Sequence, residues 1–370
     1  MRDVMNDPSI GTLLERIAML DPSDKLRFDR IFEAWAVSGS CKCPPSMAEW
    51  VQRQFGSTDR VESQTVIRVQ NTRTQEGALF NPLRASRPTT QTATNDDIID
   101  RLRSREERLR TCPFCRVREM TPVDSFRPNR IEGVHCITAS NAAKYDGRHG
   151  LIVFKEHDPL SFSLAQIRDY IDVANGWFQA AADAAEGYIY PFLMWNCRWR
   201  AGGSQEHGHM QLTVACGRHY PRVESLRRAA ADYLREHRSN YFADLFRVHE
   251  ALGLGVAARA KVMVSICPFR DKETWILGQA LDAEMAVVIH TVLATLRDHA
   301  NVRSFNMGVL LPPVVPLNDW QEFPVIVRVI DRLSVAELSS DISGMGIFAG
   351  ADAIASDPYP IANLLRDALR

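Results

Sequence analysis

One short segment of the chain alternates imidazole and amide side chains with small or apolar ones. It reads His-Gly-His-Met-Gln at residues 207–211 and leads directly into an apolar run at 212–216. Residues two apart in an extended strand point to the same face. The alternation therefore predicts a strand on which His207, His209 and Gln211 share one face.

A glycine-rich loop precedes this strand, because Gly202, Gly203 and Ser204 follow one another in the sequence. Glycine adds no side-chain bulk, and successive backbone N–H groups in such loops are typical of phosphate-binding sites. We therefore expect the loop to offer free N–H groups. Imidazole, amide and bare backbone together indicate a site that attacks or holds a phosphorus atom.

The composition excludes several classes of protein. The chain has 370 residues, of which 45% are hydrophobic and 24% charged, as is typical of a globular protein. Its 44 Lys and Arg against 45 Asp and Glu give no bias toward nucleic acid or membrane surfaces. The sequence has no run of 18 apolar residues, no signal-peptide pattern and no dense spacing of its eight cysteines. These features favour a cytoplasmic protein with reduced thiols and without nucleic-acid or membrane partners.

Helical periodicity is the main pattern near the N-terminus, over residues 8–56. The spacing of Phe28, Ile31 and Trp35 belongs to this pattern. A polar stretch with one short apolar strand at 66–69 follows it. A charged segment at about 97–110 then predicts a helix with a salt-bridged face.

Two similar successions of elements occupy the rest of the chain. The first consists of a strand at 150–155, a helix at 163–186, a strand at 191–196 and the histidine strand. After two helices at 222–252, the second consists of strands at 261–266 and 273–278, a helix at 281–300, and strands near 304–311 and 324–331. The repeated order predicts an internal duplication of an α+β unit. Hairpin-like spacings with one long helix per unit favour an antiparallel sheet.

Cys112 and Cys115 form a single Cys-x-x-Cys motif. Alone, such a motif is compatible with a redox pair, a turn or half of a zinc site. A redox pair is expected to open a helix after a buried strand, and the charged flanks here give no such context. Zinc needs two further ligands, for which His157 and His207 are the best-placed candidates. A turn residue before Pro159 is an equally good explanation of His157.

The order and spacing of several motifs match one known family. They are an Arg-Ala-x-Arg-Pro sequence at 84–88, the Cys-x-x-Cys motif, an apolar strand ending in His157, Asn196 eleven residues before His207, and Gly-x-Ser at 202–204. In this block, from Ala85 to Gln211, the chain resembles galactose-1-phosphate uridylyltransferase of the histidine-triad (HIT) superfamily. The match is strong over roughly a third of the chain and weak elsewhere.

The resemblance implies an α+β fold. Duplicated HIT-like units would have antiparallel sheets flanked by helices, and a helical N-terminal extension would precede them. The implied domains are a helical N-terminal extension and polar linker at 1–80, a catalytic HIT-like half with the zinc site at 81–220, and a second, degenerate half at 221–370. The family forms dimers, so the resemblance also implies a homodimer.

The resemblance implies a role for each motif residue. His209 would be the nucleophile that attacks the α-phosphorus of a nucleotide, and Gln211 would donate a hydrogen bond to the phosphate oxygens. Nucleotide and substrate contacts would come from Ala85, Arg87, Asn196, Gly202, Gly203 and Ser204. One structural Zn²⁺ would be bound by Cys112, Cys115, His157 and His207, because four protein ligands leave no open position.

The implied activity is a nucleotidyltransferase acting on a nucleotide sugar or sugar 1-phosphate through a covalent nucleotidyl-histidine. Two alternatives stay open. One is a phosphorylase or hydrolase of nucleoside diphosphate sugars or dinucleoside polyphosphates, and the other is a zinc-stabilised nucleotide-binding protein without turnover. The family has proline where this chain has Gly208, and its hexose-recognition tail is rewritten at 349–358. Galactose specificity therefore does not carry over.

Overall fold

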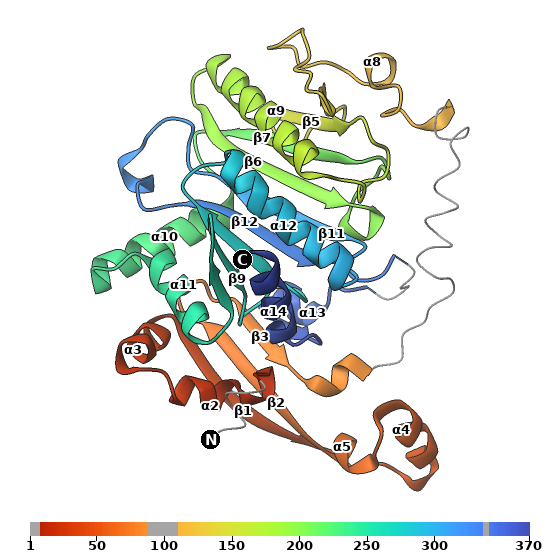
Figure 1. Ribbon diagram of the computed structural model, residues 1–370, viewed down its shortest axis with the longest axis vertical. Coiled ribbons are helices and arrows are strands. Elements are labelled where there is room, and N and C mark those ends of the chain that lie inside the picture. The colour runs from red at the N-terminus through yellow and green to blue at the C-terminus, as the bar shows by residue number, and fades with distance from the viewer. Residues whose placement is uncertain (1–7, 87–109, 336–339) are drawn as a thin grey trace.

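The computed structural model describes residues 8–86, 110–335 and 340–370 (Figure 1). Within these ranges the chain forms one nine-stranded sheet, flanked by long helices, and one four-stranded sheet near the N-terminus. The α+β prediction with antiparallel sheets and flanking helices is confirmed. No helix of the described residues has both the length and the apolar composition needed to span a bilayer.

The first half of the large sheet contains the histidine strand. Its elements are β4 (Cys136–Ser140), β5 (Arg148–Phe154), α9 (Leu164–Asp183), β6 (Tyr188–Cys197) and β7 (His209–Cys216). The strands pair antiparallel in the order β4-β5-β7-β6. Helix α9 begins with a capping box, in which Ser163 accepts the N–H of Gln166 and the Gln166 side chain bonds back to Ser163.

The second half repeats this arrangement. Its elements are β9 (Lys261–Val264), β10 (Thr274–Gly278), α12 (Ala283–His299), β11 (Phe305–Leu310) and β12 (Val325–Asp331), with β8 (Gly255–Ala257) added at the edge. The order β11-β12-β10-β9 mirrors that of the first half, and β6 pairs antiparallel with β11 at the centre. Helices α10 (Pro221–His237) and α11 (Tyr241–Ala251) connect the halves. The predicted duplication is thus confirmed in the topology.

The core lies between the large sheet and its two long helices. Helix α9 buries Ile167, Ile171 and Trp177 on one stripe, and α12 buries Met285, Ile289, Val292 and Leu296 in the same way. In β7, Met210, Leu212 and Val214 belong to this core. Because strand side chains alternate, His209 and Gln211 lie on the opposite side, which we call the open face.

The N-terminal region contains the expected helices and the short strand expected at 66–69, and also two strands, at 32–40 and 77–80, that the sequence did not indicate. Its elements are η1 (Ile10–Thr12), α2 (Leu13–Ala18), α3 (Pro22–Ile31), β1 (Phe32–Ser40), η2 (Pro45–Met47), α4 (Ala48–Phe55), α5 (Thr58–Glu62), β2 (Ser63–Asn71), β3 (Gly77–Phe80) and η3 (Pro82–Ser86). The helical interpretation of Trp35 is wrong, because β1 pairs along its length with β2. The helix predicted at 97–110 falls almost entirely outside the described residues.

The remaining elements are short or close the chain. They are α8 (Val117–Met120), η4 (Trp199–Ala201), η5 (Asn318–Trp320), α13 (Gly344–Phe348), β13 (Ala351–Ile354) and α14 (Pro358–Ala368). Strand β13 pairs parallel with β3, so it joins the C-terminal segment to the small N-terminal sheet.

His249 of α11 is a buried histidine whose two ring nitrogens both have partners. Its Nδ1 donates to the carbonyl of Leu245 at 2.7 Å, and its Nε2 accepts the N–H of Ile266 at 3.3 Å. Only the neutral ring satisfies both bonds. Burial accordingly lowers the pKa of His249 from 6.5 to about 4, against a smaller opposite effect of the Leu245 bond.

This histidine predicts a loss of stability in acid. The folded-state pKa lies below the unfolded-state pKa, so its stabilisation is present above pH 6.5 and is lost as the pH falls toward 4. We expect the free energy of unfolding to fall by about 3 kcal/mol from this group between pH 7 and 4. Urea titrations of the wild type and His249→Gln measure this difference in pH dependence. His299→Gln, at an exposed histidine, is the control, and equal pH dependence of wild type and His249→Gln would refute the prediction.

Candidate active site and metal centre

His209 and Gln211 share the open face of β7, as the alternation predicts, but the prediction is wrong for His207, because the strand begins only at His209. His209 is 5% exposed, and the ring of Phe114 lies edge-on to it with centroids 5.0 Å apart. Its Nδ1 lies 2.9 Å from the carbonyl oxygen of His207. A carbonyl only accepts, so Nδ1 carries the proton and Nε2 carries the lone pair. Burial lowers the pKa of His209, which further favours the neutral ring.

His207 lies just before β7 and turns toward the Cys-x-x-Cys motif. The ligand atoms of Cys112, Cys115, His157 and His207 all lie within 4.8 Å of one another. The structure thus brings together all four residues that the resemblance implies. The alternative of His157 as a simple turn residue does not account for this convergence.

The distances in this cluster fit a tetrahedral ion. His207 Nδ1 lies 3.5 Å from Cys112 Sγ and 3.4 Å from Cys115 Sγ. His157 Nδ1 lies 3.3 Å from Cys115 Sγ and 3.1 Å from His207 Nδ1. A tetrahedron with ordinary Zn–S and Zn–N bonds has N–S edges of about 3.5 Å and N–N edges of about 3.3 Å. The four side chains could therefore hold a metal ion.

The outer shell of this centre is also in place. His207 Nε2 donates to the carbonyl of Phe154 at 2.7 Å. This bond fixes the tautomer of His207 and leaves Nδ1 facing the cluster. Histidines that bind metals usually donate their other ring N–H to an oxygen in this way. The His207 carbonyl in turn accepts from His209, so one residue links the metal centre to the second histidine.

Packing restrains the backbone at Gly208, although glycine by itself allows many conformations. A Cβ at this position would lie 2.4 Å from Cδ2 of Phe154, whose ring stacks on Tyr170 at 4.0 Å. The N–H of Gly208 donates to the carbonyl of His157, and its carbonyl accepts the N–H of Phe154, both at 2.9 Å. Glycine at 208 is thus required by close approach to an aromatic ring.

The backbone N–H groups of Gly202 and Gly203 are paired within the loop, so the expectation of free N–H groups is wrong. The N–H of Gly202 donates to the carbonyl of Trp199 at 2.9 Å, and that of Gly203 donates to the carbonyl of Arg198 at 3.1 Å. Neither N–H is therefore free to bind a phosphate. Gly202 instead adopts a φ of 87°, and a Cβ on Gly203 would lie 2.8 Å from the Asn196 carbonyl. The two glycines shape the tight loop, which leaves Ser204 exposed.

Asn196 connects the site to the second half of the sheet. Its Oδ1 accepts from Nδ2 of Asn306 at 2.7 Å, across the β6–β11 pair. Arg332 donates to the other end of the Asn306 amide at 2.6 Å. Nothing in the sequence near the histidines indicated Asn306 or Arg332, because neither residue belongs to a motif there.

Two further residues contact Gln211 and were also not assigned. Tyr145 Oη lies 2.5 Å and His149 Nε2 lies 3.0 Å from Gln211 Oε1. The only sequence signal was a histidine immediately before the apolar run of β5. That signal is weak, because a lone histidine at a strand end is common.

Solved structures of related shape were found, whereas no protein-family model and no curated protein matches the sequence. An ADP-glucose phosphorylase from Arabidopsis thaliana, crystallised with ADP-glucose, has a TM-score of 0.59 at 16% identity, covering 80% of this chain and 97% of that chain. A GalT-like protein from the same plant has a TM-score of 0.57 at 15% identity, with 80% and 97% covered. A uridylyltransferase has a TM-score of 0.56 at 17% identity, with 82% and 98% covered.

The chain shares the fold of these solved structures. The likeness covers four fifths of the chain and so includes both halves of the large sheet, which agrees with the resemblance inferred from the motifs. At this level of identity it establishes the fold alone.

Two of the expected contact residues are not placed by the structure. Arg87 lies outside the described residues. Ala85 belongs to η3, the last element before that gap. Their expected contact with a nucleotide therefore stays a prediction.

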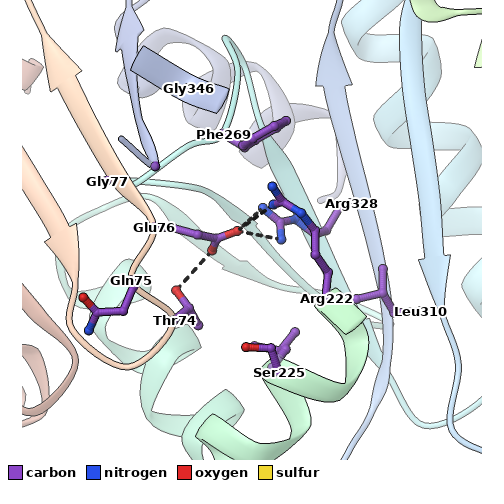
Figure 2. A pocket seen from close by; sticks show the side chains of 12 residues that line it. Thr74, Gln75, Glu76, Gly77, Arg222, Ser225, Phe269, Leu310, Arg328 and Gly346 are labelled. Atoms are coloured by element: carbon purple, nitrogen blue, oxygen red, sulfur yellow. Dashed lines mark hydrogen bonds and ion pairs between the residues drawn. The ribbon is translucent and has the colours of Figure 1, made fainter. Parts of the chain in front are cut away.

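The second half of the large sheet has a different cavity on its open face (Figure 2). The cavity has a volume of about 210 Å³ and holds Arg328, which donates to Glu273 at 2.6 Å and to Glu76 at 3.2 Å. Arg222 approaches Glu76 to 3.9 Å. Because these charges are paired with one another, the cluster joins the β2–β3 loop to β10 and β12, and we assign it a structural role.

Proposed function

We propose that the chain is a nucleotidyltransferase that acts on a nucleotide sugar or sugar 1-phosphate through a covalent nucleotidyl-histidine. The observation that carries this proposal is the bond from His209 Nδ1 to the His207 carbonyl. It supports a ring whose Nε2 lone pair is available to attack phosphorus. Gln211 lies two residues further along the same face.

In the first step, Nε2 of His209 forms a bond to the α-phosphorus, and the bond from this phosphorus to the leaving phosphate oxygen breaks. The ring becomes positively charged, and the His207 carbonyl stabilises it through the retained Nδ1–H. Gln211 donates its amide N–H to a non-bridging oxygen, where negative charge grows. In the second step an acceptor phosphate oxygen attacks the same phosphorus. The bond from phosphorus to Nε2 breaks, and the neutral imidazole is restored.

For the metal centre we propose one structural Zn²⁺. Two thiolates and two imidazoles are a donor set typical of closed zinc sites, and four protein ligands leave no position for substrate. The bound ion would hold His207, and with it the carbonyl that orients His209. Ser204, Asn196, Ala85 and Arg87 stay proposed substrate contacts, and the N–H groups of Gly202 and Gly203 do not.

The identity of the acceptor separates this function from its alternative. The likeness to an ADP-glucose phosphorylase makes inorganic phosphate the first acceptor to compare with a sugar phosphate. Water as acceptor would indicate a hydrolase. These three outcomes share the first covalent step and differ only in the second.

The test is a panel of nucleoside diphosphate sugars and dinucleoside polyphosphates with the wild-type protein. We expect intact-protein mass spectrometry to show one added nucleoside monophosphate, which peptide mapping places on His209. Addition of sugar 1-phosphate, phosphate or buffer alone then identifies the acceptor that removes it. Nucleotide binding without any adduct or label exchange across the panel would instead indicate a binding protein and overturn the proposal.

A further inference from the structure

A buried histidine and a tyrosine converge on the amide oxygen of Gln211. His149 belongs to β5, which pairs with β7, and its side chain is 0% exposed. Its Nε2 lies 3.0 Å from Gln211 Oε1, and Tyr145 Oη donates to the same oxygen at 2.5 Å. The rings of Tyr145 and His149 lie 3.9 Å apart. The amide nitrogen Nδ2 of Asn141 lies 3.1 Å from the same imidazole nitrogen, while Oδ1 of Asn141 accepts the N–H of Ala143.

The second nitrogen of His149 indicates its tautomer. The backbone N–H of Tyr145 donates to Nδ1 of His149 at 3.4 Å, so Nδ1 is the accepting nitrogen. The proton then lies on Nε2, which donates to Gln211 Oε1 at 3.0 Å, and this tautomer leaves the Asn141 Nδ2 contact to the same nitrogen without a hydrogen bond. An amide oxygen has two lone pairs, and the Gln211 oxygen receives two donors, one from each side chain.

This arrangement fixes which end of the Gln211 amide faces the open face. Rotation of the amide by 180° would break the bond from His149 and bring the NH₂ group against its Nε2–H, whereas the Tyr145 hydroxyl accommodates either orientation because it both donates and accepts. With Oε1 held on β5, the NH₂ group is the end available to a ligand. A donor that is already oriented needs no reorganisation when charge grows on a phosphate oxygen, whereas a reversed amide would present an oxygen to it.

We propose that His149, together with Tyr145, is a positioning residue that holds the amide of Gln211 with its NH₂ group toward the phosphate. This inference rests on the proposed function, in which Gln211 donates to a non-bridging oxygen. His149 acts through Gln211 and does not touch the reacting atoms.

The test compares two substitutions of the same buried residue. His149→Phe keeps the ring volume and removes the donor, whereas His149→Gln keeps an N–H donor. We expect His149→Phe to lower kcat by about tenfold or more with little change in KM, and His149→Gln to recover most of this loss. Equal kcat of His149→Phe and wild type would overturn the inference.

A double-mutant cycle with Gln211→Ala separates positioning from simple packing. If His149 acts through Gln211, adding His149→Phe to Gln211→Ala lowers kcat no further. If His149 only packs, the two losses multiply, and the inference is wrong. Urea unfolding of each variant shows whether a loss of kcat reflects a loss of folded protein.

A second measurement does not depend on turnover. We expect ¹⁵N relaxation of the Gln211 side-chain NH₂, assigned by its absence in Gln211→Ala, to show an ordered group in the wild type and a mobile one in His149→Phe. Equal mobility in both proteins would overturn the inference. Absence of turnover in the wild type, with this difference in mobility present, would refute the proposed function alone.

Discussion

Substitution of His209 by asparagine is expected to lower the rate of nucleotidyl transfer by about 10⁴-fold or more. Asparagine keeps a polar side chain of similar reach but has no nucleophilic nitrogen, so the covalent step has no route. Mass spectrometry should detect no nucleotidyl adduct on this variant with any substrate that labels the wild type.

Two controls show whether the effect comes from loss of the nucleophile alone. His299→Asn changes an exposed histidine at the end of α12, behind the sheet, and should leave both adduct and rate unchanged. His209→Asn should retain the wild-type metal content, because His209 does not belong to the ligand cluster. An adduct that persists in His209→Asn would show that another residue is the nucleophile.

Loss of the metal is expected to have the second large effect, on stability. Cys115→Ser removes one of four ligands and leaves two imidazole nitrogens 3.1 Å apart without an ion between them. Removal of a structural metal exceeds the usual range of single substitutions, so we expect the free energy of unfolding to fall by about 5 kcal/mol or more. Chelation of the wild type should have the same effect, and zinc should reverse it.

The measurements are metal content by plasma mass spectrometry and thermal unfolding with and without chelator. We expect one zinc per wild-type chain and little in Cys115→Ser. Cys216→Ser, at an exposed cysteine outside the cluster, is the matched control. A wild type that carries no metal, or one whose unfolding ignores the chelator, would refute the assignment. Because His207 also orients His209, we expect kcat to fall together with the metal content.

Much of the large sheet could be predicted from local patterns. The helix predicted at 281–300 is α12, Ala283–His299, and the strand predicted near 304–311 is β11, Phe305–Leu310. In each of these segments the apolar residues recur at a single spacing. That spacing places them on the face that the element buries. The apolar spacing of Phe28, Ile31 and Trp35 fits one helix, but α3 ends at Ile31 and Trp35 lies in β1. Pairing with β2, which lies some thirty residues further on, decided that segment.

The candidate site, too, was predictable from the sequence only in part. Order and spacing along the chain, together with the family resemblance, were enough to indicate the four residues of the Cys₂His₂ cluster, the histidine on β7 and the glutamine beside it. The hydrogen bonds of these residues were not predictable. Both loop glycines use their N–H groups within the loop, and Gly208 meets the ring of Phe154.

The sequence by itself determined which chemical groups this protein brings to its sheet, and the alternation of a single strand determined that His209 and Gln211 share a face. Only the tertiary structure decided how these groups are held. Gln211 meets His149 from another strand, and Asn196 meets Asn306 across the centre of the sheet. The reason is that partners on different strands depend on the register of pairing, which is a property of two segments together and is not encoded in the pattern of either one.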